Sequence, residues 1–327
     1  MTGKTLVTGG SGFTGGHLVR RLVVDGEAVV ALVRPSSRTT ALEELGVECR
    51  IVDLVDPEAI AAQLDGIERV YHLAAAFRSE HPDVDYFRRV NAEATRALLQ
   101  AALRTGVTRF VHCSTVGVQG DIEDPPATED YRFAPGDHYQ ETKMEGELAA
   151  REFMGRGLNV SMVRPAGIYG PGDRRFLKLF RTVARRTFRM IGSGDTLYHM
   201  TYVDDLVNGI LLAGQVPGAV GEVFTIAGPQ YTTLRELVDH LADALGVPHP
   251  RGRIPYAPVH ALAVACEKVS RGLGVSAPIY PRRVEFFAKD RAFDISKARR
   301  LLGYEPEVDL PEGLARTAAW YRANGLL

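Results

Sequence analysis

The sequence predicts an α/β protein with a doubly wound parallel sheet and a second, smaller domain. Two observations predict this fold. Short apolar strand candidates alternate with amphipathic helix candidates from residue 4 to residue 165, and this alternation is typical of a parallel sheet with helices on both faces. A glycine-rich turn follows the first strand directly, as it does in sheets that bind nucleotides at the carboxyl ends of their strands.

The elements follow one another in a regular order. We expect strands at 4–8, 28–33, 47–52, 68–73, 108–113 and 158–163, with helices at about 13–25, 57–64, 84–105 and 140–155. Glycine and proline then interrupt the pattern, and we expect further helices at about 174–186, 203–214, 232–245, 256–272, 296–302 and 311–323, with a short strand at 224–227. Residues 1–170 are therefore expected to form a dinucleotide-binding Rossmann domain, to which segments near 196–227 return. Residues 171–327 would form mainly a substrate-binding lid domain.

Glycines at positions 9, 12 and 15 form the turn after the first strand. Gly9 would let the chain turn sharply, Gly12 would let a pyrophosphate approach the backbone, and Gly15 would let the next helix pack closely. The phosphates would then bind free N–H groups at the helix N-terminus. The alternative is an ordinary tight turn, but the strand before and the apolar helix after favour a dinucleotide site. The expected contacts include Phe13 and Thr14.

The end of the second strand bears on the choice of cofactor. An NAD site usually has a carboxylate there, whereas this chain has Arg34, followed by Arg38. An arginine can pair with the 2′-phosphate of NADP, so NADP is slightly favoured over NAD. Arg34 could instead stack on adenine or remain a solvated loop charge. Asp53, after the third strand, could reach the adenine edge or could simply cap the next helix.

Small residues follow the fourth strand. Ala74, Ala75 and Ala76 would leave room for a cofactor at the carboxyl edge of the sheet. We expect Ala74 and Ala75 to contact the cofactor and Ala76 to face the substrate.

The composition narrows the class of protein. The chain has 327 residues and a net charge of −1, which gives no case for a nucleic-acid partner. No apolar run approaches the ~20 residues that span a bilayer. The three cysteines have no metal-ligand spacing, so we expect no metal site and reduced thiols in a cytoplasmic protein. A small-molecule substrate is the expected partner.

Tyr139 and Lys143 are four residues apart at the start of a predicted helix, and Thr115 ends the preceding strand. Residues at i and i+4 project from one helix face. A free tyrosine ionises near pH 10, but a lysine ammonium roughly 4 Å away, at an effective dielectric of about 20, favours the phenolate by about 4 kcal/mol. Tyr139 would then act as general acid/base, Thr115 would hold the substrate oxygen, and Lys143 would hold the nicotinamide ribose. The alternative is a surface helix pair.

These motifs resemble the extended short-chain dehydrogenases/reductases, the NAD-dependent epimerase/dehydratase superfamily. The resemblance covers nearly the whole chain. Besides the glycine loop and Tyr139/Lys143, it includes Asp53-Leu54, His72-Leu73-Ala74-Ala75, Asn91, Ser114-Thr115, Arg164-Pro165, Tyr169-Gly170-Pro171-Gly172, Val203-Asp204-Asp205 and Leu302-Gly303-Tyr304. It implies that Thr115, Tyr139 and Lys143 are the catalytic triad, that Leu54 contacts the cofactor, and that the Arg164-Pro165 turn lies beside the nicotinamide. It also implies a homodimer through the helices at about 84–105 and 140–155.

Departures from the family pattern concern the substrate. Sugar-nucleotide dehydratases have Asp-Glu after the threonine, whereas this chain has Val116-Gly117. Epimerases usually have Asn and Arg where Gly167 and Tyr198 stand. The stretch 254–294 is more similar to the 3β-hydroxysteroid dehydrogenase and dihydroflavonol reductase branches.

A basic cluster around Arg174 could bind a diphosphate or could be a solvated helix face.

The sequence as a whole is compatible with three functions. They are an NAD(P)-dependent oxidoreductase acting on a secondary alcohol or ketone, a nucleotide-sugar epimerase with tightly bound NAD, and a non-catalytic dinucleotide sensor. A sensor needs no catalytic residues, so the presence of Thr115, Tyr139 and Lys143 disfavours that function.

Overall fold

The computed structural model describes residues 3–77, 84–272, 275 and 277–327. Its centre is a seven-stranded sheet in the order β11-β6-β5-β4-β1-β2-β3, in which every neighbouring pair is parallel. The doubly wound parallel fold is thereby confirmed. The strands are β1 (Lys4–Thr8), β2 (Val29–Val33), β3 (Glu48–Ile51), β4 (Ile67–His72), β5 (Arg109–Cys113), β6 (Val160–Pro165) and β11 (Val223–Ile226).

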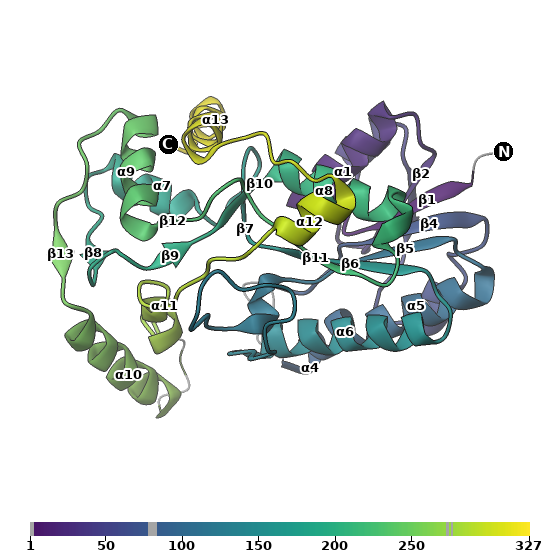
Figure 1. Cartoon of the computed structure of the whole chain (residues 1–327), viewed down its shortest axis with the longest axis horizontal. Helices are drawn as coiled ribbons and strands as arrows, with labels where there is room; N and C mark the ends of the chain where they lie inside the picture. Colours follow the sequence, from purple (N-terminus) through teal and green to yellow (C-terminus); the bar gives the residue numbers. More distant parts are fainter. Residues whose placement is uncertain (1–2, 78–83, 273–274, 276) are drawn as a thin grey trace.

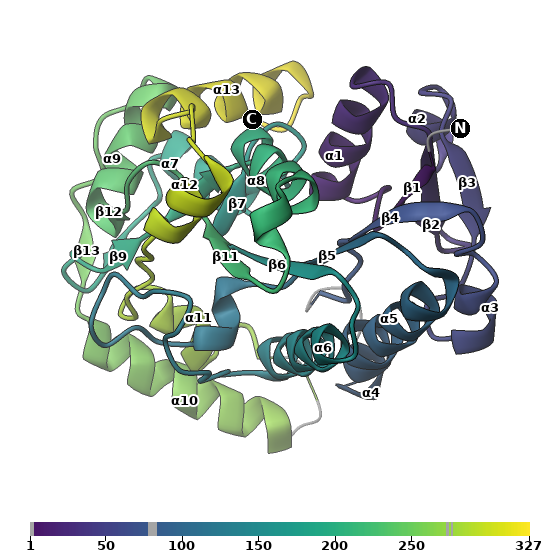
Figure 2. The same ribbon diagram turned by 45° about the vertical axis from the view of Figure 1, so that its right-hand side comes forward.

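Helices cover both faces of this sheet (Figures 1 and 2). One face carries α1 (Phe13–Val24), α8 (Val203–Gln215) and α12 (Ser296–Leu302), and α2 (Thr40–Glu43) precedes β3. The opposite face carries α3 (Pro57–Ala61), α5 (Ala94–Thr105) and α6 (His138–Gly155). Since β1 lies between β2 and β4, the strand order reverses beside it, and ligands bind at such a reversal.

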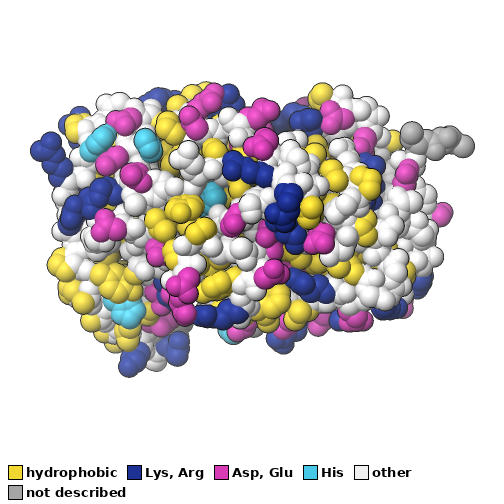
Figure 3. All heavy atoms as spheres, in the orientation of Figure 1, with side chains coloured by type: hydrophobic (Ala, Val, Ile, Leu, Met, Phe, Trp, Pro, Cys, Tyr) yellow, Lys and Arg dark blue, Asp and Glu magenta, His cyan; other side chains and the backbone are white. Residues whose placement is uncertain are grey.

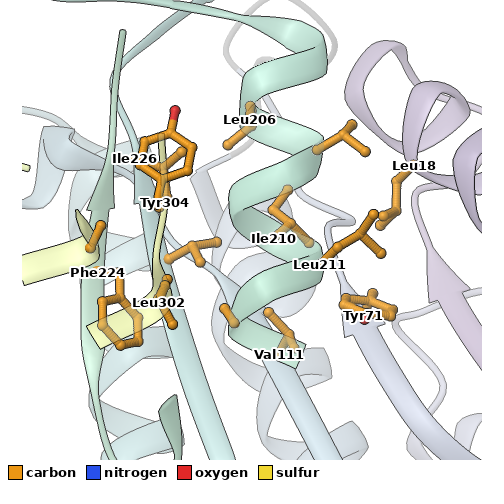
Figure 4. Packing of buried hydrophobic residues seen from close by; sticks show 14 of the residues in the cluster. Leu18, Tyr71, Val111, Leu206, Ile210, Leu211, Phe224, Ile226, Leu302 and Tyr304 are labelled. Atoms are coloured by element: carbon orange, nitrogen blue, oxygen red, sulfur yellow. The ribbon is translucent and has the colours of Figure 1, made fainter. Parts of the chain in front are cut away.

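Two apolar layers hold the sheet between its helices. The five residues of β2 are all buried, as expected for a strand covered on both faces. Figure 4 shows one layer, in which side chains of α8 such as Leu206 and Ile210 pack between Leu18 of α1 and Phe224 of β11. β11 and α12 thus belong to the same core as the N-terminal strands, although they lie about 200 or more residues later in the chain.

The predicted helix at 84–105 has an irregularity in its middle. It begins as α4 (Val84–Arg88), widens into a π-helical turn, η1 (Arg89–Glu93), and continues as α5. Such single π-turns are frequent at functional sites. A 3₁₀ turn, η2 (Val116–Gln119), follows β5, and another, η3 (Pro217–Ala219), precedes β11.

The remaining elements form a second unit with its own apolar core. That core joins α7 (Leu177–Ala184), α9 (Leu234–Leu245) and α13 (Leu310–Ala323). Three small sheets accompany it, and α10 (Tyr256–Gly272) packs against α11 (Pro281–Glu285) at its edge. The small sheets pair β7 (Gly167–Tyr169) with β10 (Met200–Tyr202), β9 (Leu197–Tyr198) with β12 (Thr232–Thr233), and β8 (Met190–Ile191) with β13 (Arg253–Ile254).

Candidate active site

The glycine turn has the geometry that a dinucleotide requires. Gly9 has a φ of +74°, in the left-handed region that favours glycine. A Cβ atom at Gly15 would overlap the carbonyl oxygen of Gly9, so the start of α1 lies tight against the turn. Gly12 is the N-cap of α1 and provides no side-chain hydrogen bond to the first-turn N–H groups. These groups therefore suit an anion such as a pyrophosphate.

A cavity of about 300 Å³ lies beside this turn, between the carboxyl ends of β1, β2 and β4. It brings together half of the cofactor-binding residues expected from the sequence, with Ala76, which was expected to face the substrate. Its lining includes Gly9, Gly12, Arg34, Asp53, Leu54, Ala74, Ala75 and Ala76. The position beyond the second and third strands fits the adenosine half of a dinucleotide.

Asp53 and Arg34 both line this cavity, just beyond the ends of the neighbouring strands β3 and β2. Asp53 accepts a hydrogen bond from the Val55 N–H at 3.2 Å, whereas the cap of α3 is Asp56, which accepts from two first-turn N–H groups. Asp53 is therefore not a helix cap. The Arg34 guanidinium reaches the Tyr86 hydroxyl at 3.5 Å, and its backbone N–H donates to Ser37.

Two of the expected cofactor residues lie on the other side of the glycine turn. Phe13 and Arg38 line a separate hollow of about 330 Å³, together with Arg20 and Trp320. Phe13 also lies under the Arg175 guanidinium, 5.7 Å from ring centroid to carbon. Thr14 is in the first turn of α1. Arg38 thus borders the turn but not the cavity that contains Arg34.

The three residues of the predicted triad lie on two elements that pack together, the turn after β5 and the start of α6. Thr115 caps η2, and its hydroxyl accepts from the Gly117 N–H at 3.1 Å. Tyr139 is in the first turn of α6, and its ring lies edge-on to Phe77, with centroids 5.1 Å apart. A Cβ atom at Gly117 would be within 3.3 Å of both Thr115 and Gln140, so the start of α6 packs directly on the turn that carries Thr115.

Lys143 lies beneath this surface. Its side chain is 1% exposed, and its ammonium donates to the Cys113 carbonyl at 2.6 Å. Burial lowers the pKa of Lys143 from its usual value, while the charge of Glu147 acts in the opposite direction. A buried lysine one turn from a tyrosine is suited to assist proton transfer at the phenol.

We expect Lys143→Met to reduce both turnover and cofactor affinity, because the ammonium would serve Tyr139 and the ribose together. The turnover should decrease by roughly two to four decades. Steady-state kinetics and a cofactor titration measure the two effects. The matched control is Lys4→Met, because Lys4 forms an exposed ion pair with Glu48. Unchanged cofactor affinity in Lys143→Met would contradict the second role.

Asn91 was not among the residues assigned to the site from the sequence. It lies in the π-turn, fully buried, and it both accepts from the Ala76 N–H at 2.7 Å and donates to the Ala76 carbonyl. It also donates to the Thr142 hydroxyl of α6. Asn91 therefore joins the loop after β4 to the helix that carries Tyr139 and Lys143. The sequence feature that could have identified Asn91 is an asparagine in the middle of a predicted helix, where this residue type is unfavourable.

The Arg164 side chain lies in the core beneath the expected nicotinamide site. Its side chain is 1% exposed and pairs with Glu147, with nitrogen–oxygen distances of 3.0 and 2.6 Å, and it also donates to the Glu129 carbonyl. This guanidinium is therefore committed to a buried ion pair. Pro165 ends β6, so only the backbone of this turn is available to a carboxamide.

Three of the four candidate substrate residues are buried or half-buried, and the fourth is on the surface. Gly167 lies against Tyr198, because a Cβ atom there would be 3.3 Å from the Tyr198 ring, and the Arg291 guanidinium lies over that ring at 5.7 Å. Ala76 is buried beside Tyr139. Arg174, in contrast, is exposed.

The basic cluster does not converge on one site. Arg175 pairs with Asp173, and Arg181 donates to the Leu326 carbonyl. Among the residues that the structure describes, no group of His, Cys, Asp and Glu side chains is arranged to hold a metal ion.

The fold and this site together define a nicotinamide-dependent enzyme. A sequence model of the NAD dependent epimerase/dehydratase family matches residues 5–227, and the chain belongs to that family. It is thus an NAD-dependent enzyme of the oxidoreductase or epimerase type. The resemblance stated from the motifs is confirmed.

Three similar proteins illustrate its range. The chain is 33% identical to sterol demethylase protein B of Methylococcus capsulatus, over 99% of each chain. It is 32% identical to a 3 beta-hydroxysteroid dehydrogenase/Delta 5-->4-isomerase of Mycobacterium tuberculosis, over 98% of this chain and 90% of that one. The structure of DesIV, a dTDP-glucose 4,6-dehydratase from Streptomyces venezuelae with NAD bound, has a TM-score of 0.79 and 29% identity, over 98% and 97% of the two chains.

No helix within the described ranges has the length and apolar character needed to cross a membrane.

Proposed function

We propose that this protein is a dehydrogenase/reductase that interconverts a secondary alcohol and a ketone carried on a ring, with a 3β-hydroxysteroid type of substrate. The observation that carries the proposal is that Thr115 lies on the turn after β5, which packs on the start of α6, where Tyr139 and Lys143 lie, one strand from the cofactor cavity. The two relatives that act on sterols or steroids, by their names, support the substrate class.

The wall beside Tyr139 supports an apolar substrate. The tyrosine lies against Phe77 and next to a small cluster of Ala76, Phe87 and Val90. Aromatic and aliphatic side chains suit the flat apolar face of a ring system. The valine and glycine after Thr115 provide no acid or base for elimination.

Each polar group of the site has one task in this reaction. When bound, the nicotinamide cofactor would supply the hydride acceptor or donor. Thr115 would donate a hydrogen bond to the substrate oxygen and hold it beside Tyr139. The phenol of Tyr139 would take the hydroxyl proton during oxidation and return it during reduction. Lys143 would stabilise the phenolate by its charge.

A second candidate is a nucleotide-sugar epimerase. The specific observation that favours it is Arg291, whose guanidinium lies over Tyr198 beside Gly167 and could pair with a diphosphate. Mass spectrometry of the purified protein separates the two candidates. Retained NAD(H) would favour the epimerase, whereas an empty, exchangeable site is expected for the dehydrogenase.

We also propose that Arg34 favours NADP over NAD. A charge-assisted pair with a 2′-phosphate contributes about 1.5–3 kcal/mol, or roughly one to two decades in affinity. Arg34→Asp should therefore weaken NADP binding by at least this factor, and NAD binding should be unchanged or stronger. Titration of both cofactors at one ionic strength measures the effect.

Arg38→Asp is the comparison variant, because Arg38 borders the other hollow. A wild-type preference for NAD, or an Arg34→Asp variant with an unchanged preference, would end the NADP assignment.

We further propose a homodimer through the helix pair α5 and α6. Leu148 of α6 is 45% exposed, and it lines a shallow hollow with Ala92, Arg88 and Arg96. Light scattering of Leu148→Glu tests this contact, since a buried charge would dissociate the dimer. A cytoplasmic location is proposed on the three free cysteines.

A further inference from the structure

The surface of α10 carries an apolar stripe on the side turned away from the protein. Pro258, Leu262, Ala265 and Val269 are all exposed and follow the spacing i, i+4, i+7, i+11, which places them along one helix face. Leu262 and Val269 are each 62% exposed. The opposite face packs inward, where Ala263 is fully buried.

Two further exposed apolar residues flank the helix. Ile254, two residues before α10, is 38% exposed, and Val275, three residues after it, is 59% exposed. Figure 3 shows the resulting group of hydrophobic side chains at the lower left, over α10, with Lys and Arg side chains beside it. Single exposed apolar residues are ordinary, but a continuous row of them marks an interaction surface.

Basic side chains border this stripe at both ends. At its start, Arg251 and Arg253 are exposed. Arg253 pairs with Met190 of β8, the residue that follows Arg189. Arg186, Arg189, His249 and Arg251 line one hollow of that surface. At the far end of α10, Lys268 and Arg271 are exposed.

Three of the acidic groups near this surface have basic partners. Glu267 faces Arg271 at 3.9 Å, Glu285 faces Lys289 at 3.1 Å, and Asp243 accepts from His249 at 2.8 Å. Between residues 254 and 272 the sequence contains one carboxylate, that of Glu267. An apolar row with a cationic border complements a layer of anionic lipid headgroups over acyl chains.

A second copy of the chain fits this surface less well. Two copies related by a two-fold axis would bring their α10 helices together antiparallel or parallel, depending on the direction of the axis. The cationic start of each helix, at Arg251 and Arg253, would then face the cationic end of the other helix or its equally cationic start. Like charges in such positions repel each other.

We propose that α10 and its basic border form a docking surface for an anionic lipid bilayer, on which the helix lies parallel to the membrane plane. The apolar stripe inserts at the level of the headgroups, and the arginines and lysine at its ends pair with lipid phosphates. This inference goes beyond the proposed reaction and does not depend on it.

Co-sedimentation with vesicles tests the proposal directly. Wild-type protein should bind vesicles that contain phosphatidylglycerol and phosphatidylcholine, should bind pure phosphatidylcholine vesicles weakly, and should dissociate as salt is added. The double variant Leu262→Asp/Val269→Asp should bind the anionic vesicles at least about 10-fold more weakly. The variant Arg251→Glu/Arg253→Glu should bind them at least roughly 25-fold more weakly, from about 1 kcal/mol per cation.

The matched control is Val24→Asp, because Val24 is 76% exposed at the end of α1, away from this surface. It should bind like wild type, and all variants should retain the wild-type circular dichroism and turnover of a water-soluble substrate. Equal binding by wild type and the Leu262/Val269 variant, or no binding of wild type to anionic vesicles, would overturn the proposal. So would a change of oligomeric state caused by that variant in sedimentation velocity, because the stripe would then contact a second copy.

Discussion

Tyr139→Phe should lower turnover by roughly two to four decades, the usual contribution of a general acid/base. The substitution removes only the hydroxyl, and the ring can keep its edge-on contact with Phe77 at 5.1 Å. The phenol would act on the proton of the substrate and not on the phosphates. Cofactor affinity should therefore remain near that of wild type.

Turnover and cofactor titration, measured on the same preparation, separate these two quantities. Tyr231→Phe is the control, because Tyr231 is 42% exposed and lines a cavity outside the cofactor site. Near-normal turnover of Tyr139→Phe would remove this residue from the mechanism. A similar loss of turnover in Tyr231→Phe would show that the loss in Tyr139→Phe comes from a disturbed fold and not from the missing acid/base.

Glu147→Gln should destabilise the protein by about 3–5 kcal/mol, because it leaves the buried Arg164 without a counter-charge. Glu147 is fully buried and also accepts from the Ser114 hydroxyl at 2.8 Å. Burial alone would raise the pKa of Glu147, but hydrogen bonds from Arg164 and its charge outweigh burial and hold this pKa below its usual value. The free energy of unfolding, from denaturant titration, measures the loss.

Glu152→Gln is the matched control on the same helix. Glu152 pairs with Arg96 at 2.8 Å on the surface, and such exposed pairs contribute about 0–1 kcal/mol.

The pH dependence gives a second check on Glu147. Because its folded-state pKa is lowered, its contribution is present above the unfolded-state pKa and is lost as pH falls through the folded-state value. Wild type should therefore lose more stability than Glu147→Gln on acidification below about pH 4.5. Equal acid sensitivity of the two proteins would contradict the proposed charge pairing.

The parts of the fold that follow from local patterns could be predicted from the sequence. Hydrophobic alternation and the glycine turn determine the order of strands and helices, and α10 and α12 have the predicted bounds. The residues of the cofactor cavity could be named because the carboxyl ends of parallel strands meet at one edge.

Features that depend on distant partners could not be predicted in this way. The N-cap of α8 is Tyr202. Asp205, in the first turn of this helix, accepts from the N–H groups of Glu307 and Val308, about 100 residues away. The π-turn around Asn91 and the pairing of Arg164 with Glu147 likewise arise from contacts between elements. Sequence spacing alone carries no signal for such contacts.

The central claim is net hydride transfer at a ring-borne alcohol or ketone, and nicotinamide absorbance tests it most directly. Purified protein is mixed with an excess of NAD or NADP and a 3β-hydroxysteroid, and the ketone product is quantified in the same sample. We expect reduced nicotinamide to accumulate mole for mole with ketone, and Tyr139→Phe to slow the formation of both by roughly two to four decades. Interconversion of a nucleotide sugar with its epimer, with no net change in nicotinamide absorbance and no activity on the steroid, would contradict it.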